Sequence, residues 1–228
     1  MTRSARALIA FVFAATLASS GCGPPKPQAE QALYNEANGQ FDATNFETAT
    51  SLYEELLEQY PFSDLAEASR LRIAHAYYLS GDYEKAIAAF NDFERLHPTS
   101  SQLPFVEYTI GMSYLDQART RDRDSSASDS ALRQFERVHE SYPETLWSRL
   151  AQFRIAQCRE KLAGHELYVG DYYKRVGKRT AARARYQYVL DTYPDSDAAL
   201  LARERLADAD LTRSDDVKND VPIEADTP

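Results

Sequence analysis

The chain has little of what β-strands, disulfide scaffolds and nucleic-acid interfaces require. Only eight glycines occur in 228 residues, and alternating runs of Val, Ile and Thr are absent, which argues against strands. The two cysteines, Cys22 and Cys158, are too few for a disulfide framework. The formal net charge is −9, and Lys and Arg are interspersed with acids instead of clustered against phosphates. We therefore expect no nucleic-acid partner.

Complete motifs for catalysis, metal binding and cofactors are also missing. His139 and His165 are each followed by glutamate, as in zinc proteases, but the second histidine of that motif would fall at Pro143 and Val169. Gly177-Lys178 lacks both the leading glycine and the following Ser or Thr of a phosphate-binding loop. We therefore expect no enzyme activity, no catalytic residues, no metal and no cofactor.

What the chain does have is a recurring unit of alanine, aromatic residue and proline. The four sets are Ala49/Tyr53/Pro61, Ala86/Phe90/Pro98, Ala131/Phe135/Pro143 and Ala182/Tyr186/Pro194. Alanine and an aromatic residue four apart share one face of a helix, and proline ends the helix. Such recurrence is typical of tetratricopeptide repeats, which present a curved surface to other polypeptides.

Apolar residues at three- and four-residue steps predict an all-α fold of ten helices. Their expected ranges are 28–41, 44–60, 64–80, 82–96, 103–118, 128–142, 145–162, 164–176, 178–193 and 196–211. Paired antiparallel, they would form a superhelical array of about five tetratricopeptide-like hairpins over residues 30–211. The N-terminal repeats would occupy 30–96 and the C-terminal repeats 103–211.

Two features interrupt the regular repeat. The polar segment 117–128 is predicted to be a surface loop between two helices of one repeat. Three helices, not two, fit between Pro143 and Pro194, so the repeat phase stays open over 145–211. Gly170 and Tyr186 would also fit the repeat pattern if the repeat unit were shifted by one helix.

Local signals mark helix ends and one buried position. Asp64 with Glu67 is a plausible capping box for the third helix, and Gly81 is expected to end that helix. Cys158 shares a helical stripe with apolar neighbours, which predicts a small buried hydrophobic side chain. A reactive thiol is the alternative for this cysteine.

Residues 1–21 have the layout of a secretory signal peptide, and Cys22 follows directly. Arg3 and Arg6 precede an apolar core from Ala7 to Ala18, which is shorter than the ~20 residues that span a bilayer. The end of the signal resembles the lipobox of bacterial lipoproteins, in which the cysteine is acylated. An ordinary cleaved signal with an incidental cysteine is the alternative.

The two ends of the mature chain differ in character from the repeats. Residues 22–29 are predicted to form a lipidated N-terminus and a proline-rich linker that holds the domain off a membrane. Gly23 after the cysteine favours the outer membrane over inner-membrane retention. Residues 212–228 carry five acids and two bases and are predicted to be a disordered acidic tail.

Together these features resemble the BamD family, the tetratricopeptide lipoproteins of the outer-membrane β-barrel assembly (BAM) machinery. The stretches that carry the resemblance are Tyr60-Pro61-Phe62, Ala76-Tyr77-Tyr78, Asp122-Arg123-Asp124, Tyr168 to Tyr173, and Asp191-Thr192-Tyr193-Pro194-Asp195. Their order, together with the lipobox, is the specific signal. The loop around 118–128 is shorter than is usual in the family.

The resemblance implies a periplasmic scaffold, lipid-anchored to the outer membrane through Cys22, for inserting β-barrel proteins. The implied partners are a BamA-type barrel protein, other assembly lipoproteins and unfolded barrel precursors. By position, Tyr60 matches a family tyrosine linked to precursor recognition, and Arg185 a family arginine at the BamA contact. The alternatives from the residues alone are a helix-end core aromatic for Tyr60 and a solvated side chain for Arg185.

Other envelope systems also use tetratricopeptide lipoproteins. The alternatives are an adaptor of the Tol–Pal or polysaccharide-export systems and a regulator that docks a peptidoglycan hydrolase. The expected repeats begin almost directly after Cys22, without the coiled-coil segment expected of the Tol-linked type, which favours the assembly machinery.

Overall fold

The computed structural model describes residues 27–120 and 125–208, and this part of the chain is entirely helical. Its helices are α1 (Pro27–Asp42), α2 (Phe46–Gln59), α3 (Ala66–Leu79), α4 (Tyr83–Leu96), α5 (Leu103–Thr120), α6 (Ser126–Ser141), α7 (Leu146–Arg175), α8 (Arg179–Thr192) and α9 (Asp197–Ala207). The predicted all-α class is confirmed. The predicted signal peptide, the lipidation site Cys22 and the acidic tail 212–228 lie outside the described residues.

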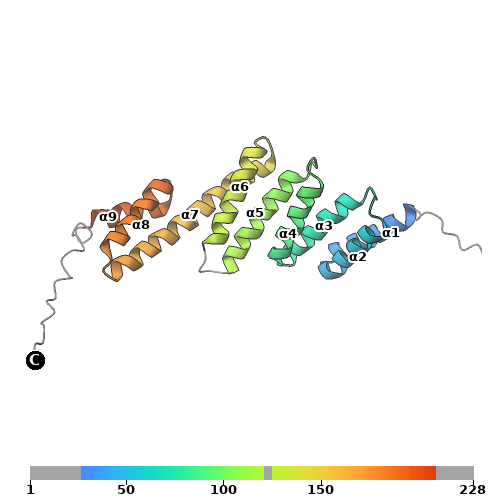
Figure 1. Cartoon of the computed structure of the whole chain (residues 1–228), viewed down its shortest axis with the longest axis horizontal. Coiled ribbons are helices and arrows are strands. Elements are labelled where there is room, and N and C mark those ends of the chain that lie inside the picture. The colour runs from blue at the N-terminus through green and yellow to red at the C-terminus, as the bar shows by residue number, and fades with distance from the viewer. Residues whose placement is uncertain (1–26, 121–124, 209–228) are drawn as a thin grey trace, which may run out of the picture.

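The helices follow one another as a single elongated array (Figure 1). Each helix packs chiefly on its neighbours in sequence, from α1 at one end to α9 at the other. The buried apolar residues accordingly form four clusters spread along the array rather than one central core. This arrangement is the one expected of a repeat protein, in which each unit contacts only the adjacent units.

The recurring alanine and aromatic residue form the centre of each hairpin. All four alanines and all four aromatic residues of the repeated unit are fully buried: Ala49 and Tyr53, Ala86 and Phe90, Ala131 and Phe135, and Ala182 and Tyr186. In the last two units a glycine of the preceding helix faces the ring. A Cβ at Gly111 would lie 2.7 Å from the Phe135 ring, and one at Gly170 would lie 2.6 Å from the Tyr186 ring.

The predicted helix ends match the structure at the turns. Gly81 and Gly177 have φ values of +82° and +78°, a conformation that L side chains rarely adopt. Tyr60, His97, Tyr142 and Tyr193 are the C-caps of α2, α4, α6 and α8, and each is followed directly by the proline of its repeat.

The prediction of ten helices is wrong in the C-terminal half, because the described residues form nine. The segments expected at 145–162 and 164–176 are one helix of 30 residues, α7. No proline lies inside it, and Gly164, where the break was expected, has open space around it. A lone glycine in a helix costs about 1 kcal/mol relative to alanine and does not by itself end the helix.

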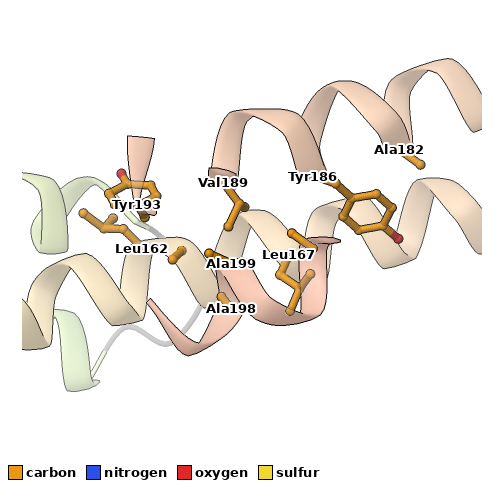
Figure 2. Packing of buried hydrophobic residues seen from close by; sticks show 10 residues of the cluster. Leu162, Leu167, Ala182, Tyr186, Val189, Tyr193, Ala198 and Ala199 are labelled. Carbon is orange, nitrogen blue, oxygen red and sulfur yellow. The ribbon is translucent and has the colours of Figure 1, made fainter. Parts of the chain in front are cut away.

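Helix α7 serves two hairpins in succession. Its first half packs on α6 through Ala151 and Cys158. Its second half packs on α8 and α9 through Leu162 and Leu167, and in Figure 2 the ring of Tyr186 points from α8 toward α7. The unit shifted by one helix, with Gly170 facing Tyr186, is therefore the one that the structure adopts.

Three local predictions need correction. Helix α1 begins at Pro27, inside the predicted linker 22–29, since proline suits the first turn of a helix. Helix α5 ends at Thr120 and helix α6 begins at Ser126, so the two helices include most of the residues of the predicted loop 117–128. The capping box is not formed: the N-cap of α3 is Leu65, without a side-chain cap, and Glu67 accepts a hydrogen bond from Ser100 instead.

Cys158 is fully buried, as predicted. Burial is also the main reason that the pKa of its thiol rises to about 11. Because the thiolate is the nucleophile, this environment favours the packing role over the reactive one.

Candidate functional site

A row of aromatic rings crosses the N-terminal and central repeats, with one ring from each of α1, α3, α5 and α7. His75 of α3 lies 5.6 Å from Phe41 of α1 and 5.5 Å from Phe105 of α5, between ring centroids. Trp147 of α7 lies 5.2 Å from Phe105. We call these four residues the aromatic row. Phe41 is buried, whereas His75, Phe105 and Trp147 are partly exposed, and exposed aromatic surface offers rigid contact area for a polypeptide.

An open pocket of about 420 Å³ lies beside the aromatic row. Its wall includes His75 and Phe105 of the row, together with Glu67 and Arg72 of α3. The guanidinium of Arg72 lies 4.7 Å from the centre of the Phe41 ring, a cation–π distance. With Asp64 also in its wall, the pocket combines apolar ring surface with two acidic side chains and one basic side chain.

His75 is the titratable member of the aromatic row. Burial, followed by the nearby charge of Arg72, holds its pKa below the ordinary value of 6.5. The imidazole is therefore neutral at neutral pH and offers one donor and one acceptor. A neutral imidazole with one donor and one acceptor is able to hydrogen-bond the backbone of a bound polypeptide.

The turn from α2 to α3 exposes a second aromatic feature. The Phe62 side chain is 98% exposed. Tyr60, two residues earlier, is half-buried and ends α2, its backbone N–H donating to the Leu56 carbonyl. The whole Phe62 ring is thus available for contact with a partner.

Tyr60 differs from its counterparts in the other repeats. The hydroxyl of Tyr142 donates to Glu107 over 2.7 Å, Tyr193 is buried against Tyr188, and His97 packs on Phe93. Within the described part of the chain, the Tyr60 hydroxyl has no hydrogen-bond partner. Three of the four positions therefore stabilise the fold, while Tyr60 keeps its polar tip available.

Arg185, on α8, is already engaged within the chain. Its Nη1 donates to Oε2 of Glu166 on α7 over 2.8 Å, and the Arg185 side chain is 44% exposed. The hydrogen bond to Glu166 is the first cause of the raised pKa of Arg185. The sequence did not reveal this partner because the two residues meet only once α7 and α8 form a hairpin.

Sequence reasoning missed the aromatic row and an ionic network. Phe41 and His75 are 34 residues apart, one tetratricopeptide period, and this spacing could have indicated the row. In the network Arg137 donates to Glu94 of α4 and Glu107 of α5. Nothing in the local sequence pointed to that contact.

Within residues 27–120 and 125–208, no group of three or more His, Cys, Asp and Glu side chains could hold a metal ion. In the same ranges, no helix has the length and apolarity needed to cross a bilayer.

Comparisons with known proteins agree with the resemblance seen in the sequence. The outer membrane protein assembly factor BamD of Neisseria meningitidis serogroup B is 30% identical over 174 residues, covering 72% of this chain and 65% of that protein. The Vibrio cholerae protein of the same name is 31% identical, covering 73% of each chain. A solved tetratricopeptide protein of Thermus thermophilus is 17% identical with a TM-score of 0.43, covering 81% of this chain and all of that one.

The family model described as "Outer membrane lipoprotein", YfiO, matches residues 26–220. This match includes every described helix and both proposed contact residues, Tyr60 and Arg185. The chain therefore belongs to the YfiO family of outer-membrane lipoproteins.

Proposed function

We propose that this protein is a lipid-anchored periplasmic scaffold of the outer membrane that serves the assembly of β-barrel proteins. Membership of an outer-membrane lipoprotein family supports the location, and relatives at about 30% identity are named as assembly factors. The partly exposed rings of the aromatic row, His75, Phe105 and Trp147, carry the proposal because they offer a surface suited to holding a polypeptide. Phe41 is buried and supports the row from the core of the N-terminal repeats.

In this proposal the N-terminal repeats receive unfolded barrel precursors. The pocket beside His75 directly follows the turn that carries half-buried Tyr60 and exposed Phe62, since Asp64 and Glu67 line the pocket just after that turn. Aromatic faces, a neutral imidazole, two acidic side chains and one basic side chain fit a segment of mixed polar and aromatic composition. Tyr60 supplies a hydroxyl and Phe62 an apolar face.

The test uses a peptide with the C-terminal sequence of a barrel precursor. Replacing both Tyr60 and Phe62 with Ala should weaken binding of this peptide by tenfold or more, measured by fluorescence anisotropy. The matched control is Leu200→Ala on α9, an exposed apolar residue at the other end of the array. If the double variant and the control bind the peptide with equal affinity, the result contradicts precursor binding at this surface.

The C-terminal repeats dock on the BamA-type barrel protein through Arg185. The Glu166 bond uses one of the five N–H groups of the guanidinium, so the exposed remainder is able to meet a carboxylate of the partner. Arg185→Glu should abolish co-purification of the partner from solubilised membranes. A reversed charge on the partner should restore it. Unchanged co-purification would contradict the proposal.

The anchor is the acylated Cys22. Cys22→Ala should move the protein from the membrane fraction to the soluble fraction, because acyl chains supply ~0.8 kcal/mol of membrane affinity per buried methylene. Retention of this variant in the outer membrane would show that another attachment holds the protein.

A further inference from the structure

The first half of α7 presents an apolar face that no described helix covers. Leu146, Leu150 and Phe153 follow at steps of four and three residues, so their side chains share one face. They are 55%, 38% and 60% exposed. Ala151 and Cys158, on the opposite face, are fully buried against α5 and α6.

This exposure follows from the unusual length of α7. Helix α8 has 14 residues and packs on the second half of α7, where the shared cluster begins at Leu162. The first half has α5 and α6 on one side and the turn from α8 to α9 beside Gln152 and Arg159. Leu146, Leu150 and Phe153 stay exposed beside both contacts. A tetratricopeptide array would place another helix on such a face.

Basic side chains border the apolar face, and they have no acidic partner in the described residues. These basic side chains are Arg149, Arg154 and Lys161. Arg154 donates to the Tyr108 hydroxyl and to Gln157, and Lys161 donates to the Ala118 carbonyl. Within residues 27–120 and 125–208, no carboxylate lies within 4.0 Å of any of the three.

Three other bases of α7 and α8 are paired with carboxylates. Arg159, the next arginine on α7, lies 3.7 Å from Glu136, and Lys174 and Arg185 also contact carboxylates. In a chain with a formal charge of −9, acids outnumber bases. Three bases without a carboxylate partner around one apolar stripe form a basic border that an acidic partner would complement.

We propose that this face of α7 binds an amphipathic helix of a partner protein whose apolar stripe is flanked by carboxylates. Steps of four and three residues match the seam by which one helix packs along another. Lys161 follows Leu146 by 15 positions, or about 22 Å of helix, which corresponds to a partner helix of roughly four turns.

A second copy of this chain is a poorer occupant. Packing two such faces together would bring the same basic borders, including Arg149 and Arg154, against each other, and like charges repel at this range. The proposed contact goes beyond the Arg185 contact, which lies on α8, and does not depend on it.

The test places a photocrosslinking residue, p-benzoylphenylalanine, at position 153 of the full lipidated chain in its own membrane. The matched control carries it at position 200 of α9, where Leu200 is 62% exposed. The expected result is one crosslinked product at 153, absent at 200. Its attached peptide, identified by mass spectrometry, should belong to another protein and form a helix with acids beside an apolar stripe.

Several results would overturn the proposal: equal products at both positions, no product at 153, or a product with lipid, a second copy or residues 209–228 of this chain. A charge test accompanies the crosslink. The double change Arg149→Glu and Arg154→Glu should lower the yield at 153 at least tenfold, whereas changing both to Lys should leave most of it. Unaltered thermal unfolding of the Glu variant excludes misfolding as the cause, and an undiminished yield would contradict the charge match.

Co-purification of the BamA-type protein is measured on the same membranes. If the Arg149→Glu and Arg154→Glu variant loses the crosslink but keeps co-purification, the result bears on the α7 contact and not on docking through α8. If Arg185→Glu loses co-purification but keeps the crosslink, the result bears on docking through α8 and not on the α7 contact. The two proposals thus fail separately.

Discussion

The ring of Tyr186 lies so close to Gly170 that a Cβ at position 170 would be 2.6 Å from the ring Cε1. The Tyr186 hydroxyl donates to Oδ1 of Asp171, the next residue, over 2.7 Å. Tyr53 has the equivalent bond, to Asn38 over 2.7 Å and also 15 residues earlier. The first and last hairpins are therefore built alike, although α7 is twice the usual length.

Gly170→Ala should destabilise the protein. The added methyl group must displace the Tyr186 ring, and overpacking of this kind costs about 1–3 kcal/mol, partly offset by up to 1 kcal/mol of helix propensity. Gly164→Ala, on the same helix in open space, should instead stabilise by about 0.5–1 kcal/mol. Urea unfolding of both variants measures the difference, and equal effects would show that the contact imposes no constraint.

The protein should lose stability as pH rises above 10. Burial raises the pKa of Tyr53 to about 12 and also raises that of Tyr186. The unfolded chain then releases these protons first, so their stabilising effect is complete below pH 10 and is lost toward pH 12. Tyr53→Phe should flatten the fall in melting temperature between pH 9 and 11. An unchanged slope would count against the burial of this hydroxyl.

His75 should make the fold sensitive to mild acid. Its folded pKa is lowered, so the unfolded chain binds the proton more readily below about pH 6.5, and stability falls as pH decreases through that range. His75→Gln should reduce the loss of melting temperature between pH 7.5 and 5. Arg72→Gln, which removes the neighbouring charge, should reduce it in part. Identical pH profiles in all three proteins would contradict this account.

Removing Arg137 should be costly. Its guanidinium bonds Glu107, whose side chain is only 3% exposed, and it also pairs with Glu94. Leaving a buried carboxylate without its cation typically costs about 3–5 kcal/mol. Arg137→Ala should therefore lower the free energy of unfolding by several kcal/mol, measured in urea. Restoring most of the stability by adding Glu107→Gln would identify the unpaired charge as the cause, whereas no recovery would point to lost packing.

The helices themselves were largely predictable because their signals are local. Ala86 and Phe90 mark one helical face, and Gly81 marks a turn, so these elements were found with correct types and nearly correct ends. The break expected near Gly164 failed for a non-local reason. Whether a glycine interrupts a helix depends on what packs beside it, and α6 and α8 each hold one half of α7 in place.

The candidate site, like the fold, was only partly predictable from the sequence. Tyr60 could be selected from the sequence as a repeat-end aromatic, but its unpaired hydroxyl is apparent only beside the bonded Tyr142. The intramolecular partner of Arg185 and the aromatic row through His75 were not visible, because their members come from different helices.

The sequence by itself determined the helical class, the repeat and its buried alanine and aromatic positions, since spacing along one helix dictates which side chains share a face. Only the tertiary structure decided the repeat phase at Gly170 and Tyr186, the single long α7 and the surfaces left open. Those features depend on contacts between residues far apart in the chain, and packing between helices, not local propensity, selects them.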